Sequence, residues 1–322
     1  MDEDRGRPSR PRKGAPANRS RLLIGVAWRG AVAIAVTTAS SWIAVRELRA
    51  MDSAALITTL RSMPASAVAA SVAFTLASYA CLAVQEGFGL AMFHRRPPFW
   101  RIGINALIAN ALAGVLGFGL ATGGALRLRL YRFVGLSPVR IAELGLVLSL
   151  ATYFGGMATM GLSVIAGPRA AAASVGWALA PTVLAAAVLV VPAILWMSPV
   201  RPAQRTLTAS GRLAALAASL GDWMFSGAAL FCVSGQGLAH FPTYLAAFCL
   251  GSLIGSLAGV PAGLGVLEAA MLTLASRAQL RETAAALIVY RAIYFAGPAA
   301  CAAVALLLLQ AAELRRLRPG RG

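Results

Sequence analysis

The chain has 322 residues and a net charge of +18, and 59% of its residues are hydrophobic while only 12% are charged. This composition lies outside the range of soluble globular domains. In a soluble protein the positive charge would suggest nucleic acid as a partner, but in so apolar a chain basic residues retain loops on the cytoplasmic side of a membrane. We therefore exclude a soluble domain and a nucleic-acid partner, and expect an integral inner-membrane protein.

The apolar residues form long runs, and about 20 residues of helix cross a bilayer core. Because backbone in hydrocarbon must satisfy its own hydrogen bonds, the runs predict an all-α polytopic bundle. In chain order the predicted helices cover residues 24–45, 66–91, 102–121, 141–166, 175–198, 208–235, 243–275 and 284–310.

The remaining segments are assigned by charge and spacing. Residues 1–21 are predicted to be a disordered basic cytoplasmic tail, 22–312 a single membrane domain, and 313–322 a short basic cytoplasmic tail. Within the membrane domain, residues 46–63 have the amphipathic spacing of a helix that lies at the interface.

Two of the predicted helices, 102–121 and 243–275, are interrupted by glycine or proline. Backbone that leaves the helix at membrane depth persists only where it is buried in protein or lines a cavity. The predicted breaks are at Gly123, Gly124, Pro261, Gly263 and Gly265.

The arginines distinguish two topologies. If all eight segments cross the membrane, the basic clusters at 127–140 and 201–212 face outward, against the positive-inside tendency. If both interrupted segments are re-entrant hairpins, these clusters and both termini lie in the cytoplasm. We therefore predict about six full spans and two hairpins that open to opposite sides, with seven or eight full spans as the alternative. Such paired interrupted segments are typical of transporters with inverted repeats.

Ionisable residues within a membrane helix cost at least about 2.5–3.5 kcal/mol each at the bilayer centre, which makes them functional candidates. The intramembrane candidates are Asp222, Glu268 and Arg291. Pairing Arg291 with either carboxylate would offset part of the cost of burial. Arg291 is then either a ligand for a lipid phosphate or a permanent structural partner that fixes helix packing.

Three arginines follow the first break: Arg127, Arg129 and Arg132. A broken helix presents N–H groups that attract anions, and arginine binds phosphate bidentately. We predict that these arginines hold an anionic lipid head group at the cytoplasmic mouth, with ordinary positive-inside anchoring as the alternative. Gln85 and Glu86, which end the second predicted helix, are predicted to be interfacial anchors.

The sequence lacks the signatures of an enzyme. No hydrolase-like order of Ser, His and Asp, no phosphate-binding loop and no metal-ligand spacing is evident. The four cysteines are far apart within apolar runs. We expect no catalytic activity, no metal and no cofactor.

Four motifs occur in order between residues 22 and 312: TGGALRLRLYR at 122–132 with Gly135 and Ser137, GDW at 221–223, VPAGLGVLE at 260–268, and YRAIY at 290–294 with Pro298. They resemble the transmembrane module of the lysylphosphatidylglycerol synthase/flippase family. Ala262 and Leu267 stand where that family usually has Gly and Phe. The resemblance implies a module that moves or presents lipids, here a stand-alone version without the aminoacyl-transferase domain of the bifunctional members.

These observations lead to a hypothesis of lipid transport. The protein would bind and flip an anionic or amphiphilic phospholipid through a polar groove lined by Asp222, Glu268 and Arg291. Transport would be passive, or driven by membrane potential or by a proton gradient through Glu268. The alternatives are a non-catalytic scaffold that anchors a separately encoded lipid- or sugar-modifying enzyme and, with less support, an intramembrane transferase.

Overall fold

The computed structural model describes residues 53–317 except for 118, 132–133, 168–208 and 277–278. The predicted helices 24–45 and 175–198, the tail 1–21 and Arg132 lie outside the described residues. Within them all regular structure is helical, as predicted. The α-helices are α2 (Ser53–Arg61), α3 (Ala65–Ala91), α4 (Phe99–Leu116), α5 (Gly119–Leu130), α6 (Pro138–Ala166), α9 (Ala209–Cys232), α10 (Phe241–Leu257), α11 (Val266–Leu274), α12 (Leu280–Tyr290) and α13 (Gly297–Leu317).

Short helical turns join some of these helices. They are the 3₁₀ turns η3 (Leu238–His240) and η4 (Pro261–Gly263) and the π-helical turn η5 (Arg291–Ala296), which makes α12 and α13 continuous. Six helical stretches of the described chain are long and apolar enough to cross a membrane, which confirms the predicted all-α polytopic bundle. They are Ala65–Ala91, Phe99–Leu116, Pro138–Ala166, Leu213–Cys232, Leu238–Leu257 and Leu280–Ala312.

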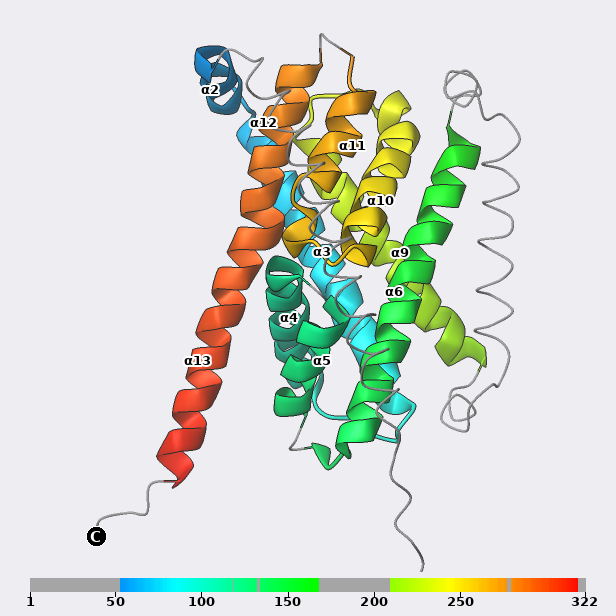
Figure 1. Cartoon of the computed structure of the whole chain (residues 1–322), viewed down its shortest axis with the longest axis vertical. Helices are drawn as coiled ribbons and strands as arrows, with labels where there is room; N and C mark the ends of the chain where they lie inside the picture. Colours follow the sequence, from blue (N-terminus) through cyan, green and yellow to red (C-terminus); the bar gives the residue numbers. More distant parts are fainter. Residues whose placement is uncertain (1–52, 118, 132–133, 168–208, 277–278, 318–322) are drawn as a thin grey trace, which may run out of the picture.

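Two pairs of helices form hairpins in opposite halves of the bundle. In Figure 1, α4 and α5 occupy the lower half, whereas α10 and α11 occupy the upper half. With 12 and 9 residues, α5 and α11 are about 18 and 14 Å long at 1.5 Å per residue, well short of a bilayer core of roughly 30 Å. The described residues therefore form a helical hairpin at each of the two predicted positions, with a second arm that is too short to cross, whereas the first arms, α4 and α10, belong to the six stretches of span length.

The two halves of the described chain repeat one order of elements. Helix α3, the α4–α5 hairpin and α6 are followed by α9, the α10–α11 hairpin and the continuous α12–α13. The first helices of the two repeats, α3 and α9, pack along each other at the centre. Glycines bring other helices into close contact: a Cβ on Gly156 of α6 would lie 2.5 Å from Cε2 of Trp223 on α9. Small residues of this kind are typical of helix contacts in membranes.

The first hairpin turns at Gly117, and the prediction of a break at Gly123 and Gly124 is wrong. Gly117 has a φ of +77° and a ψ of −177°, a region open almost only to glycine, and α5 begins at Gly119. Gly123 and Gly124 lie inside α5, because a helical glycine costs only about 1 kcal/mol and need not break the helix. A Cβ on Gly123 would lie 3.0 Å from Nη1 of Arg127, so this glycine makes room for the guanidinium.

The second hairpin has a longer turn, between Leu257 at the end of α10 and Val266 at the start of α11. It contains η4, with Pro261 as its first residue, and glycines with φ of +61° at Gly263 and +80° at Gly265. Ala262, one of the departures from the family pattern, adopts a φ of +52°.

The two hairpin turns touch each other. A Cβ on Gly117 would lie 2.8 Å from the carbonyl oxygen of Gly259 and 2.9 Å from the backbone nitrogen of Pro261. Since the hairpins come from opposite ends of the bundle, their turns meet in its middle. Non-helical backbone from both repeats is thus gathered at one depth, enclosed by the longer helices.

Candidate functional site

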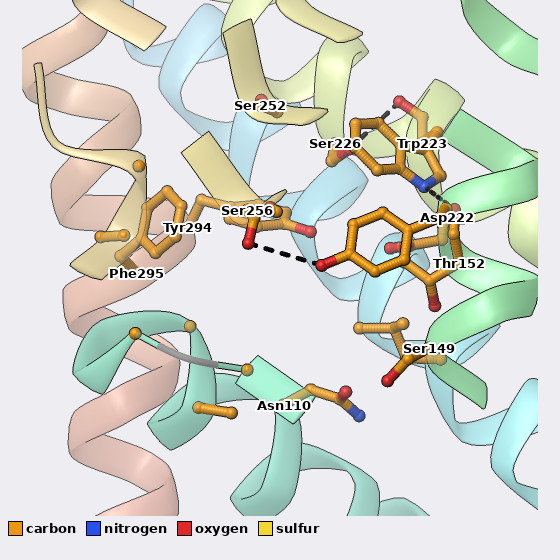
Figure 2. A pocket seen from close by; sticks show the side chains of 18 of the residues that line it. Asn110, Ser149, Thr152, Asp222, Trp223, Ser226, Ser252, Ser256, Tyr294 and Phe295 are labelled. Atoms are coloured by element: carbon orange, nitrogen blue, oxygen red, sulfur yellow. Dashed lines mark hydrogen bonds between the residues drawn. The ribbon is translucent and has the colours of Figure 1, made fainter. Parts of the chain in front are cut away.

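A cavity of about 250 Å³ lies where the two turns meet. Both repeats contribute to its wall, from α3, the first hairpin and α6 on one side and from α9, α10, the second turn and α12–η5 on the other. Figure 2 shows polar side chains arranged around it. Those labelled include Asn110, Ser149, Thr152, Asp222, Ser252 and Ser256. Polar side chains on an otherwise apolar wall can hold water or the polar part of an amphiphilic ligand.

The first buried ion pair joins α5 to α3 at this cavity. Arg127 donates two parallel hydrogen bonds to Glu86, from Nε to Oε1 and from Nη2 to Oε2, each 2.7 Å long. Nη2 also donates to Oδ1 of Asn110 at 3.3 Å. Both charged side chains are almost fully buried, with exposed fractions of 7% and 1%. This fork-to-fork geometry is the strongest that an arginine and a carboxylate form.

The position of Glu86 contradicts its prediction as an interfacial anchor. Its closeness in sequence to Arg95 and Arg96 suggested pairing at the membrane surface, whereas the helix places it beside α5. Its neighbour Gln85 is also buried and accepts a hydrogen bond from Thr152 of α6 at 3.3 Å. Gln85 and Glu86 lie between one and two turns from the C-terminal end of α3, and two adjacent polar residues within an apolar helix were the available signal. The partner of Glu86 is 41 residues away in sequence.

The second ion pair fixes the second turn. Of the two predicted partners, Arg291 binds Glu268, with its Nε 2.7 Å from Oε1. The guanidinium also donates to the carbonyl oxygens of Ala262 and Gly263. Oε2 of Glu268 accepts from the backbone N–H of Gly265 at 2.8 Å and so caps α11. The guanidinium of Arg291 and the carboxylate of Glu268 thus form hydrogen bonds with backbone carbonyl and N–H groups that the break in the helix leaves without helical partners.

Asp222 lies apart from both ion pairs. It is buried on α9, lines the cavity and accepts a 2.5 Å hydrogen bond from the hydroxyl of Ser78 on α3. The same hydroxyl lies 2.9 Å from the hydroxyl of Tyr294. Among the described residues, no cation lies within ion-pair distance of Asp222, so the alternative pairing with Arg291 is not formed.

The predicted groove of Asp222, Glu268 and Arg291 is therefore corrected. Asp222 lines the cavity, but Glu268 and Arg291 do not, because they are occupied with the backbone of the second turn. Arg127 replaces them, and it is the only cation among the described residues that line the cavity.

The three arginines predicted to act together are also divided. Arg127 is buried against Glu86, whereas Arg129 is exposed; Arg132 lies outside the described residues. At about 100° per helical residue, positions two apart point roughly 200° from each other. Arg127 and Arg129 therefore serve opposite faces of α5.

A helical bundle with these apolar spans and a sheltered polar centre is an integral, multi-pass membrane protein. No protein-family profile matches the chain. The chain is 23% identical over 269 residues to the uncharacterized protein slr0712 of Synechocystis sp., covering 78% of this chain and 82% of that protein. It is 32% identical over 108 residues to the inner membrane protein YbhN of Escherichia coli, covering 33% of each. The spans and this second similarity assign the protein to the inner membrane; the cytoplasmic placement of its termini stays a prediction.

Proposed function

We propose that the protein carries the polar head group of an anionic or amphiphilic phospholipid from one leaflet of the inner membrane to the other. The observation that carries the proposal is a cavity with polar side chains on its wall, at the point where two hairpin turns from opposite ends of the bundle meet. Moving polar groups through hydrocarbon costs several kcal/mol for each hydrogen bond lost, and a preformed polar path lowers that barrier. Broken helices that meet at the midplane are the usual construction of such sites in transporters.

The cavity offers a position for a phosphate group. Among the described residues, none of the hydrogen bonds of Arg127 uses Nη1, the guanidinium nitrogen next to Gly123. A lipid phosphate at Nη1 leaves the pair with Glu86 intact, so neither charge becomes unpaired. Hydroxyls of Ser149, Thr152 and Ser252 on the opposite walls replace water around the rest of the head group.

The resemblance to the lysylphosphatidylglycerol synthase/flippase module supports the same proposal independently of the cavity. We propose that the chain is a member of that family. The four motifs that carry the resemblance include buried and half-buried charged residues of the structure. Arg127 lies in the first motif and Asp222 in the second, and the Glu268–Arg291 pair joins the third to the fourth.

The test is to fill the cavity without altering a charge. Ser252 lines the cavity from α10, whereas Ile254 on the same helix is 44% exposed on the outer surface. Full-length protein in liposomes should accelerate transfer of fluorescent phosphatidylglycerol between leaflets, measured by loss of signal to an impermeant quencher. Ser252→Trp should abolish this acceleration, whereas Ile254→Trp should preserve it.

Two results would contradict the proposal. If Ser252→Trp and Ile254→Trp accelerate lipid transfer equally, the lipid head group does not pass through the cavity. No acceleration by the wild-type protein over empty liposomes would favour the alternative, a scaffold for a separately encoded lipid- or sugar-modifying enzyme.

A further inference from the structure

A second depression, of about 1090 Å³, lies on the outer side of the first hairpin. Its walls are α4 and α5, the loop before α6 and its first turn, and the C-terminal half of α13. We call it the lateral groove. It shares no lining residue with the central cavity. It is therefore a separate site that faces the surroundings of the bundle.

The lateral groove is apolar along most of its length. Ile104 of α4 and Leu128 of α5 face Leu306 and Leu309 of α13 across it. Such walls exclude a soluble anion as the natural occupant, since they offer nothing to a hydrated ion and suit a hydrocarbon chain.

One end of the lateral groove is basic and polar. Arg101 near the start of α4 and Arg129 near the end of α5 both line it, and these two helix ends lie at the same end of the bundle. Among the described residues, Arg129 makes no ion pair or hydrogen bond that would neutralise it. Trp100 beside Arg101 is 60% exposed, and exposed tryptophan marks the head-group level of a bilayer.

A buried amide adds a polar contact deeper in the groove. Asn105 lines the groove, is only 3% exposed and lies within hydrogen-bonding reach of the buried Tyr131. No hydrogen bond of standard geometry to a described residue satisfies its Nδ2, so the amide can still donate to an acceptor that a ligand supplies. The ester carbonyls of a glycerolipid lie a few ångströms below its phosphate, which is the depth at which Asn105 follows Arg101 along α4.

We infer that the lateral groove is a specific binding site for one glycerophospholipid molecule. Its phosphate lies between Arg101 and Arg129, an ester carbonyl accepts from Asn105, and an acyl chain lies against Leu306 and Leu309 of α13. Basic pockets between membrane helices bind lipid head groups in this way. The inference does not depend on translocation, because a bound lipid can be a substrate at its point of entry or a permanent structural lipid.

The experiment measures binding and not transport. Full-length protein in detergent is titrated with phosphatidylglycerol and the bound lipid is counted by native mass spectrometry. Arg129→Ala should weaken the first binding step at least about tenfold, because it removes a charge-assisted hydrogen bond to the lipid phosphate. Arg140→Ala is the matched control, because Arg140 is exposed at the start of α6, at the same end of the bundle, and does not line the groove. Its affinity should equal that of the wild type.

A second variant tests the groove without removing charge. Ala125 is exposed and lines the groove, so Ala125→Trp fills it and should also weaken the first step about tenfold. Equal losses in the two arginine variants, or wild-type affinity in Ala125→Trp, would reduce the binding to general surface electrostatics and overturn the inference. Glycerol 3-phosphate should not compete at matched concentration; equal competition would make the site one for free phosphate.

The outcome is separable from that of the transport assay. Loss of lipid binding in Arg129→Ala with a wild-type protein that does not flip lipid supports the lateral groove and removes the proposed function. If the wild type flips lipid normally but Arg129→Ala and Arg140→Ala bind lipid equally well, the proposed function is supported and the lateral groove is ruled out as a specific lipid site.

Discussion

Each of the two hairpins contains one half of an ion pair, but the two ion pairs bind different parts of the protein. In the first, the turn is short, and Arg127 binds Glu86 on the neighbouring helix α3 beside the cavity. In the second, the turn is long, and the Glu268–Arg291 pair binds the backbone of the turn itself, away from the cavity. The first pair therefore ties a hairpin to its scaffold and leaves one edge of a cation available. The second pair is a structural clamp for unpaired backbone.

The largest effect is expected from breaking the more buried pair. Arg127→Ala leaves the carboxylate of Glu86, 1% exposed, without its partner and should lower the free energy of unfolding by about 3–5 kcal/mol. Denaturant titration of the protein in detergent micelles measures this. The control is Arg129→Ala on the exposed face of the same helix, which should change stability by less than about 0.5 kcal/mol. Similar losses of unfolding free energy in Arg127→Ala and Arg129→Ala would show that Arg127 does not form a stabilising buried ion pair with Glu86.

The two turns should differ in their tolerance of a side chain. Gly117→Ala combines a backbone region almost restricted to glycine with a Cβ 2.8 Å from a carbonyl oxygen, and should cost about 3 kcal/mol. Gly263→Ala should cost about 1 kcal/mol, because its φ of +61° is the milder left-handed region and its Cβ meets nothing closer than 4.0 Å. The same titration compares them. A costlier change at Gly263 would mean that the turns are not packed as described.

A smaller effect separates the two ion pairs when both charges of a pair are removed together. Glu86→Gln with Arg127→Gln leaves two amides that can bond each other, so most of the loss seen in Arg127→Ala should be recovered. Glu268→Gln with Arg291→Gln should remain about 1–2 kcal/mol less stable than that variant, because the carbonyls of Ala262 and Gly263 lose their donor. Equal stability of the two double variants would show that the Glu86–Arg127 pair and the Glu268–Arg291 pair do not differ in the way described.

The fold was largely predictable because its signals are local. Apolar runs of span length and clusters of arginine are read along the chain, and they predicted the bundle and the two hairpins. The second break was equally local, since Pro261 and the adjacent glycines interrupt any helix. The first break was misplaced because glycine at 123 and 124 is compatible with a helix, and only the backbone dihedrals distinguish Gly117 from them.

The site was less predictable because its partners are distant in sequence. Glu86 and Arg127 are 41 residues apart, and only the packing of α3 against the first hairpin brings them together. The division of Arg127 from Arg129 was within reach of sequence reasoning, because residues two apart on a helix point to opposite faces. Treating the arginines as one cluster, as if they followed a loop, concealed this difference.

The central claim is that two hairpins enter from opposite sides and meet at a shared cavity, and accessibility of single cysteines tests it most directly. In a variant without Cys81, Cys232, Cys249 and Cys301, one cysteine is placed at an exposed base of a hairpin: position 96 or 137 for the first, 238 or 276 for the second. An impermeant maleimide should label 96 and 137 from the cytoplasmic side only, and 238 and 276 from the opposite side only. Labelling of the two bases of either hairpin from different sides would make that segment a full span and contradict the account.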